Sequence, residues 1–246
     1  MKSLLVVIIL FCLIFIGEFK AYSNEFQKNE YSINLPDGWI EIPKDIIESN
    51  TNEMSKKVPN IARPYYDSGF QLAENQNWFE FPYVFIAFDN KGRVPEREIK
   101  KIEDKFNQKL LDKVNNNLNP LISNLQNGEM FYEKQANIIW MRMSSDVPDK
   151  GKMVTLTAMI PTEKGFIEIY CYSSEDSFLD YESIFKSIVM SVKLAPKLVY
   201  KPNWTDNLPT GVAGINWENV LVKAIAGAII GGIITFIGVL SKKNKK

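Results

Sequence analysis

The chain has 246 residues, 29 basic and 29 acidic side chains, and no histidine. The lack of histidine excludes the commonest general base, the Ser-His and Cys-His nucleophile pairs, and the usual zinc and non-haem iron ligand sets. The zero net charge hides an asymmetry: residues 24–196 carry 20 basic and 26 acidic side chains, while the last six residues contain four lysines. An acidic domain of this kind lacks the positive footprint of a nucleic-acid-binding protein.

Residues 1–23 have the pattern of a secretory signal peptide. A Met-Lys start precedes an apolar run over residues 4–16, and Ala-Tyr-Ser at 21–23 offers the small residues that a signal peptidase reads. We expect export with cleavage near Ser23, and an uncleaved N-terminal anchor is the alternative. After cleavage Cys171 would be the only cysteine, so no internal disulfide could form and the core would have to stabilise the domain.

The first half of the predicted exported domain, residues 24–196, mixes strands and helices. Residues 30–35 alternate apolar and polar side chains, Pro-Asp-Gly at 36–38 is typical of a turn, and residues 39–42 resume an extended pattern, which together predict a hairpin. A helix over 44–57 should follow.

Two strands and a long helix come next. Strands are expected at 65–72 and 81–88, and the second is apolar enough to be covered on both faces. Apolar residues then recur at spacings of three and four from Ile99 to Val114, with a proline at 95 and three asparagines at 115–117, so one long helix is predicted there.

The second half is predicted to contain three strands and a terminal helix. The strands are expected over 130–145, 153–160 and 166–172, with a hairpin loop at 162–165, and the helix should begin after Ser173 or Ser174. Because side chains alternate along a strand, residues 166–172 have two distinct faces. One face holds Ile167, Ile169 and Cys171, and the other holds Phe166, Glu168, Tyr170 and Tyr172. Cys171 is therefore interpreted as a small core residue.

The C-terminal region is interpreted as a linker over 197–218, a transmembrane helix over 219–240 and a basic cytoplasmic tail over 241–246. The apolar run from Val220 to Leu240 would span about 32 Å as a helix, which matches the hydrocarbon core of a bilayer. Upstream tryptophans and downstream lysines place the tail in the cytoplasm. These features predict a single-pass protein of a cell membrane, bacterial in type, with its N-terminal domain extracytoplasmic.

Small residues within the predicted span favour helix–helix contact. Gly227 and Gly231 form a GxxxG pattern, and Ala228 and Gly232 belong to a second row of small residues beside it. Such rows allow two helices to approach closely, so a homodimer or a partner helix is predicted. The alternative is that glycine is simply frequent in membrane helices.

The order of elements resembles the Mog1/PsbP-like α/β/α sandwich, an α/β (α+β) fold with helices packed on an antiparallel sheet. The residues that carry the resemblance are Tyr-Ser-Ile-Asn-Leu-Pro-Asp-Gly-Trp at 31–39 and the helix at 181–192, and it covers about residues 28–194. It implies a non-enzymatic domain that acts as a binding partner. No functional motif of the family's photosynthetic or nuclear-transport branches matches here, so neither role is expected.

Few residues suggest chemistry, and we expect neither cofactor nor metal. Glu80 and Glu168, each beside aromatic residues, are the carboxylates that a histidine-independent enzyme would use. Aromatic side chains are the other signal, and some could line a partner or ligand surface rather than only the core. The candidates for that surface are Tyr65, Tyr66, Trp78 and Phe79.

The leading functional prediction is a membrane-tethered extracytoplasmic binding or scaffold protein that acts through an unknown protein partner and is not an enzyme. Two alternatives stay open: a carboxylate hydrolase of envelope polymers, and a module that binds a lipid or another apolar ligand.

Overall fold

The computed structural model of the chain describes residues 24–58, 64–119, 121–148, 151–201, 203, 206 and 216–234. The strands are β1 (Asn24–Gln27), β2 (Tyr31–Leu35), β3 (Trp39–Glu41), β4 (Ser68–Leu72), β5 (Tyr83–Asp89), β6 (Ser123–Glu133), β7 (Ile138–Val147), β8 (Gly151–Thr162), β9 (Gly165–Ser174) and β10 (Lys193–Leu194). The helices are α2 (Lys44–Lys57), α3 (Glu96–Ile99), α4 (Ile102–Lys105), α5 (Gln108–Leu118), α6 (Glu175–Met190) and α7 (Trp217–Ile233). The predicted signal peptide and basic tail lie outside the described residues.

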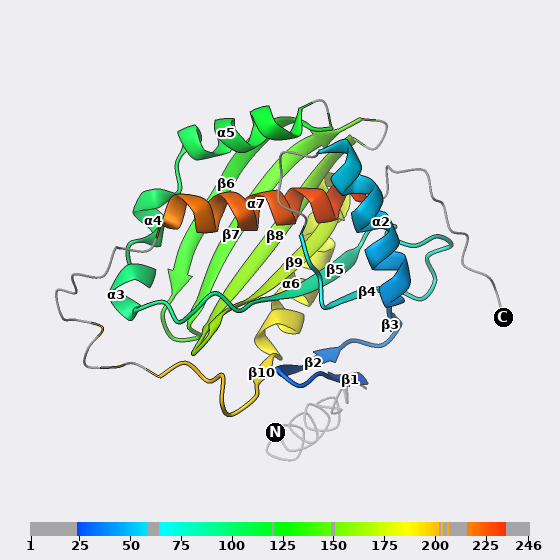
Figure 1. Cartoon of the computed structure of the whole chain (residues 1–246). Helices are drawn as coiled ribbons and strands as arrows, with labels where there is room; N and C mark the ends of the chain where they lie inside the picture. Colours follow the sequence, from blue (N-terminus) through cyan, green and yellow to red (C-terminus); the bar gives the residue numbers. More distant parts are fainter. Residues whose placement is uncertain are drawn as a thin grey trace, which may run out of the picture.

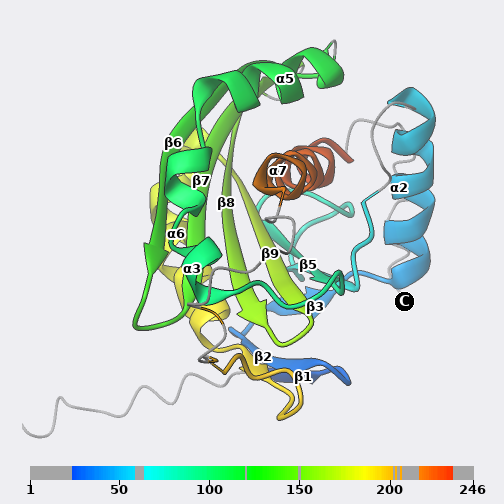
Figure 2. The same ribbon diagram turned by 60° about the vertical axis from the view of Figure 1, so that its left-hand side comes forward.

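The strands form a seven-stranded antiparallel sheet in the order β3-β4-β5-β9-β8-β7-β6 and a small sheet in the order β1-β2-β10. The large sheet is curved, and α7 lies in its hollow with α2 and α5 nearby (Figures 1 and 2). Helix α6 lies on the opposite face, where it contacts β8, β9 and β2. We call these two sides the α7 face and the α6 face. The prediction of an antiparallel sheet with helices packed on it is confirmed.

Local sequence explains several of these elements. Asn107 begins α5, and its side-chain oxygen accepts a hydrogen bond from the backbone N–H of Leu110 at 3.1 Å. Helix α2 matches its predicted bounds, with Asp45 in the first turn and lysines in the last, a distribution that complements the helix dipole. Gly165 directly follows the turn of the β8–β9 hairpin and has a φ of 145°. A Cβ there would lie 1.9 Å from the carbonyl oxygen of Asp89. The hairpin therefore requires glycine at that position.

The predicted hairpin over 30–42 is wrong in its pairing. Strand β2 pairs with β1 and β10, whereas β3 pairs with β4, where Trp39 lies opposite Leu72. The turn after Leu35 therefore carries the chain from the small sheet to the large one. Both segments are extended as predicted, but long-range contacts select their partners.

Two other predicted elements need correction. The long helix at 95–117 is three short helices, α3, α4 and α5. The break between α4 and α5 lies at Asn107, which has an extended backbone and caps α5. The strand group at 130–145 is two strands, β6 and β7, joined by a turn at 134–137. The sequence reading also missed β1 and β10.

The predicted transmembrane helix takes a different place in the structure. Residues 217–233 form α7, which lies on the large sheet with Ala224, Ile225 and Ala228 fully buried and Ile229 1% exposed. Within the described residues, no helix combines the length and apolar character that a bilayer crossing requires. An apolar surface all round a helix suits burial in protein as well as in lipid, and here the sheet provides that burial. Residues 235–240 of the predicted span lie outside the described residues.

The predicted linker is bound to the domain at its start. Leu198 is 1% exposed, and Val199 forms a bridge with Thr162. Arg93 binds residues that come after Val199 in the chain. Its guanidinium pairs with both carboxylate oxygens of Asp206, at 2.6 and 2.7 Å, and donates to the carbonyl oxygen of Lys201 at 2.7 Å. This bidentate pair keeps the pKa of Asp206 at about 2. The spacer interpretation is thus wrong for these residues, and residues 207–215 lie outside the described part.

Candidate ligand site between the sheet and helix α7

The floor of the candidate site comes from the two central strands, β5 and β9. They pair so that Phe85 lies opposite Tyr170 and Ala87 lies opposite Glu168. Phe166, Tyr170 and Tyr172 belong to the core on the α7 face, while Ile167, Ile169 and Cys171 belong to the core on the α6 face. The predicted alternation along this strand is confirmed, and so is the prediction that Cys171 is a core residue.

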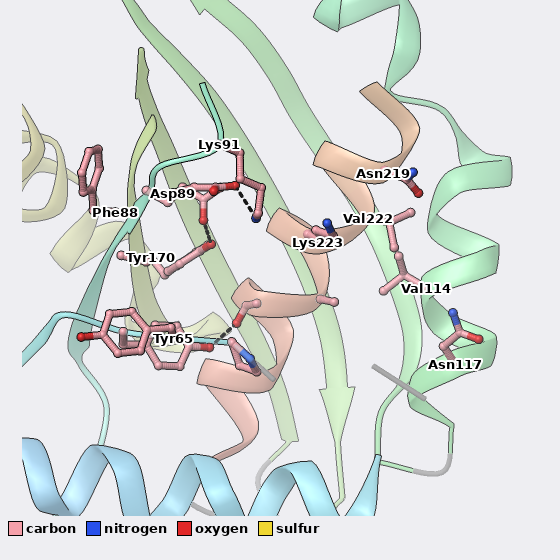
Figure 3. A pocket seen from close by; sticks show the side chains of 16 residues that line it. Tyr65, Phe88, Asp89, Lys91, Val114, Asn117, Tyr170, Asn219, Val222 and Lys223 are labelled. Carbon is pink, nitrogen blue, oxygen red and sulfur yellow. Dashed lines mark hydrogen bonds and ion pairs between the residues drawn. The ribbon is translucent and has the colours of Figure 1, made fainter. Parts of the chain in front are cut away.

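A cavity of about 420 Å³ lies over this floor, between the sheet, α5 and α7. Apolar and aromatic side chains make much of its wall: Tyr65, Tyr66, Val114, Tyr170, Val222 and Ala226. Its polar residues are Asp89, Lys91, Asn117, Glu168, Asn219 and Lys223. Figure 3 shows Tyr170 and Asp89 on one side of α7, and Val222 and Asn219 of α7 on its other side, toward Val114 and Asn117 of α5. This mixture of apolar walls and a few polar groups is typical of small-molecule sites.

Glu168 is the buried acid of this cavity. Its side chain is 8% exposed, and the Tyr170 hydroxyl donates a hydrogen bond to it. Burial raises the pKa of Glu168 to about 7, while the hydrogen bond from Tyr170 opposes that rise and the charge of Asp89 adds to it. Lys91 lies nearby but forms its ion pair with Asp89, at 2.8 Å. Among the described residues, none forms a salt bridge with Glu168.

Three tyrosine–glycine contacts position α7 over the sheet. Tyr66 donates to the carbonyl oxygen of Gly227 at 2.6 Å. Tyr83 donates to the carbonyl oxygens of Gly231 and Gly232 at 2.9 and 3.0 Å. The bonds from Tyr83 reach carbonyl groups in the last turn of the helix, where intrahelical partners run out, and all three bonds satisfy buried tyrosine hydroxyls. Helix α7 is therefore held to the sheet by specific polar contacts as well as by apolar packing.

The predicted helix–helix residues lie in this helix–sheet interface. A Cβ at Gly231 would lie 2.2 Å from the Tyr172 hydroxyl, and one at Gly232 would lie 2.2 Å from the sulfur of Met153. A Cβ at Gly227 would lie 3.1 Å from the Tyr170 hydroxyl. Ala228 is fully buried. The small residues thus provide the close approach that their pattern indicates, but in this structure they approach tyrosine and methionine side chains of the sheet.

The predicted aromatic surface divides into two parts. Tyr65 and Tyr66 line the cavity, with Tyr65 58% exposed and Tyr66 2% exposed. Phe79 is buried in the core on the α7 face, where its ring lies 5.7 Å from that of Phe85, and Trp78 packs partly buried against the same core. Trp78 and Phe79 are not among the cavity residues, so they contribute to packing.

The two carboxylates noted from the sequence also differ. Glu80 accepts hydrogen bonds from the backbone N–H of Gln76, at 2.8 Å, and from the side chain of Asn77, at 2.5 Å, so it orders a loop. Glu168 alone lies in the cavity. Sequence reasoning missed Asp89, Lys91 and Lys223, since it placed α7 in a membrane and gave no reason to bring these residues together.

The similarity of this chain to known proteins is found among solved structures. No family model matches the chain, and no curated protein matches it. Among solved structures, the chain is similar to the solution structure of cyanobacterial PsbP (CyanoP) from Synechocystis sp. PCC 6803, with 16% sequence identity and a TM-score of 0.44, over 73% of this chain and 96% of that chain. The PsbP-like fold is the one that the sequence resembles. No partner or activity is taken from this similarity.

Proposed function

We propose that this chain is a binding module that holds a small, largely apolar molecule in the cavity between α7 and the sheet. The observation that carries the proposal is the cavity itself: about 420 Å³ of space beside the core of the α7 face, lined by tyrosines and aliphatic side chains. Natural pockets for small ligands have this size and composition. The role is one of binding and requires no catalytic turnover.

The polar groups of the cavity support a ligand site rather than a packing defect. A void left by poor packing is usually apolar, because burying a polar group without a full set of partners costs free energy. This cavity instead has a buried carboxyl group on its floor and Asn117, Asn219 and Lys223 in its wall, all three exposed. Such an arrangement gives a ligand an enclosed apolar part and a polar part that sets its orientation.

The experiment is a titration of the purified full-length chain by calorimetry with three six-carbon probes: hexanol, hexanoate and hexylamine. Binding of at least one of them should be lost in Val222→Trp, because a large ring on α7 would fill the cavity that Val222 lines. Val220→Trp is the matched control, since Val220 is a partly buried valine of the same helix that is not among the cavity residues. If none of the three probes binds, or if both variants bind like the unmodified chain, the proposal is wrong.

The predicted membrane helix and protein partner remain predictions, and the first is an alternative to this proposal, because residues 217–233 cannot lie both in a bilayer and on the sheet. The apolar run at 220–240 and the four lysines that follow it support the membrane helix. Extraction of the full-length chain from its host membranes at alkaline pH checks the first, because a helix anchored in the bilayer stays in the pellet.

A further inference from the structure

We infer that the cavity recognises a protonated amine that carries an apolar body, with the carboxylate of Glu168 and the rings of Tyr66 and Tyr170 as the groups that bind the ammonium. This inference rests on the proposed function and names the chemical class of its ligand.

The first reason is the missing positive partner of Glu168. A carboxylate taken out of water is stable only when it is paired or well hydrogen-bonded. Here the hydrogen bond comes from one neutral hydroxyl, that of Tyr170. The charge of Lys91 acts on Glu168, but Lys91 forms its ion pair with Asp89. Lys223 is exposed on α7, and within the described residues neither lysine forms a salt bridge with Glu168. A cation that enters the cavity would supply the partner that the described chain does not.

The second reason is the aromatic surroundings. Tyr66 and Tyr170 line the cavity with their rings 5.9 Å apart at 88°, an edge-to-face arrangement, and Tyr65 lies at its rim. One face of the Tyr66 ring is stacked on Phe85, with ring centres 4.5 Å apart, so only the remaining ring surface is available to a ligand. Aromatic faces attract cations through their quadrupole, and the attraction increases where water is excluded. Tyr65 already binds a cation: the ammonium of Lys44 donates a hydrogen bond to its hydroxyl at 2.8 Å and lies 4.7 Å from its ring centre. Tyrosine rings beside a carboxylate that has no salt bridge within the described residues form a site suited to an ammonium group.

The third reason concerns the rest of the ligand. From the floor, the cavity extends between α5 and α7, where Val114, Val222 and Ala226 line it. An alkyl or aryl chain attached to the amine would bury its apolar surface there. Hydroxyl- or carboxylate-bearing chains of the same length would fill the same space, but neither would neutralise Glu168.

A pH dependence follows from the charged and titratable groups that face Glu168. These are Tyr170 on the same strand, Asp89 and Lys91 at the end of β5, Tyr66 before β4, and Lys223 on α7. Burial raises the pKa of both tyrosines, so they stay neutral between pH 6 and pH 8, while an alkylamine stays charged. Glu168, with its pKa near 7, changes charge in that interval. The amine should therefore bind more tightly at pH 8 than at pH 6, whereas binding of hexanol should not change.

The test compares hexylamine, hexanol and hexanoate on the full-length chain at pH 6 and pH 8. At pH 8 we expect hexylamine to bind about tenfold more tightly than hexanol, and this preference should disappear in Glu168→Gln, which keeps the size and removes the charge. Glu182→Gln is the matched control, because Glu182 lies on α6 at the opposite face of the sheet. It should leave the preference unchanged.

A second variant keeps the test valid if Glu168→Gln folds poorly. Tyr170→Phe removes the hydrogen bond that favours the ionised carboxyl, so the pH at which hexylamine binding strengthens should move upward. Equal binding of hexylamine and hexanol at pH 8, tighter binding of hexanoate, or an amine preference that persists in Glu168→Gln would overturn the amine assignment while the binding module stands. If no probe binds, the proposed function falls as well.

Discussion

The two faces of the large sheet come from alternate residues of the same strands, yet they differ in chemistry. On β9, the α6 face receives Ile167, Ile169 and Cys171, all fully buried. The α7 face receives Glu168, Tyr170 and Tyr172. One side is closed by apolar packing against α6. The other uses tyrosine hydroxyls to hold a helix and leaves a cavity beside it.

The buried hydroxyl groups of the two faces also differ in their hydrogen bonding. Ser145, Thr155 and Thr157 lie on the α7 face, and their buried hydroxyl oxygens have no hydrogen-bond partner within the described chain. On the α6 face, the buried hydroxyl of Tyr31 is paired with that of Ser68 at 2.7 Å. Unpaired buried polar groups lower stability and concentrate where a structure serves a purpose other than packing. This contrast is consistent with the proposal that the α7 face holds a ligand site while the α6 face supplies stability.

The largest expected effect is on the α6 face. Phe185 is fully buried and packs edge-to-face on Trp39, with ring centres 6.5 Å apart. Truncation in Phe185→Ala should lower the free energy of unfolding by about 3–5 kcal/mol, measured by chemical denaturation. While the protein remains folded, probe binding in the cavity should stay unchanged. Loss of binding under native conditions would show that the two faces are not separable.

The next effect concerns the charge of Glu168. Its pKa is about 7 in the folded chain, against an ordinary value of 4.5, so between these pH values the folded state keeps a proton that the unfolded state loses. The contribution of Glu168 to stability should be fully present below pH 4.5 and should be lost as the pH rises to 7, by an amount of the order of 3 kcal/mol. Denaturation of the unmodified chain and of Glu168→Gln over this range isolates the effect, because other groups cancel in the difference. Parallel pH profiles would contradict it.

The glycines of α7 give a graded effect. Gly231→Ala places a Cβ 2.2 Å from the Tyr172 hydroxyl, so α7 must shift away from the sheet, at a cost of about 1–3 kcal/mol. Gly227→Ala meets its nearest atom at 3.1 Å and should cost less. Thermal unfolding and probe binding of both variants measure the difference. The order would be reversed, or absent, if α7 did not pack against these tyrosines.

The smallest effect has the opposite sign. Thr157 is fully buried and its hydroxyl is unpaired, so Thr157→Val should leave stability unchanged or raise it by up to about 1 kcal/mol. Tyr31→Phe, which breaks a paired hydroxyl on the α6 face, should lower stability by about 1 kcal/mol. Chemical denaturation of the two variants side by side tests the contrast. A clear loss in Thr157→Val would mean that its hydroxyl has a partner.

Part of the site could be predicted from the sequence. Alternation along residues 166–172 places Glu168 and Tyr170 on one face, and the aromatic pair at 65–66 was identified as a candidate ligand surface. The cavity could not be predicted, because its third wall is α7. An apolar run of 21 residues has the same pattern whether its surroundings are lipid or a curved sheet, so its sequence indicates burial without saying what buries it.

What the sequence determined by itself is local. Side-chain periodicity defines most strands and helices and the two faces of β9, and the absence of histidine removes whole classes of chemistry. The tertiary structure decided which strands pair, that residues 217–233 pack on the sheet, and that the Glu168 side chain lines a cavity. The physical reason is that periodicity reports which side of an element is buried, whereas partners far apart in the chain are chosen by packing and hydrogen bonding after those elements form. Tyr66 and Gly227 are 161 residues apart, and only the folded chain brings them together.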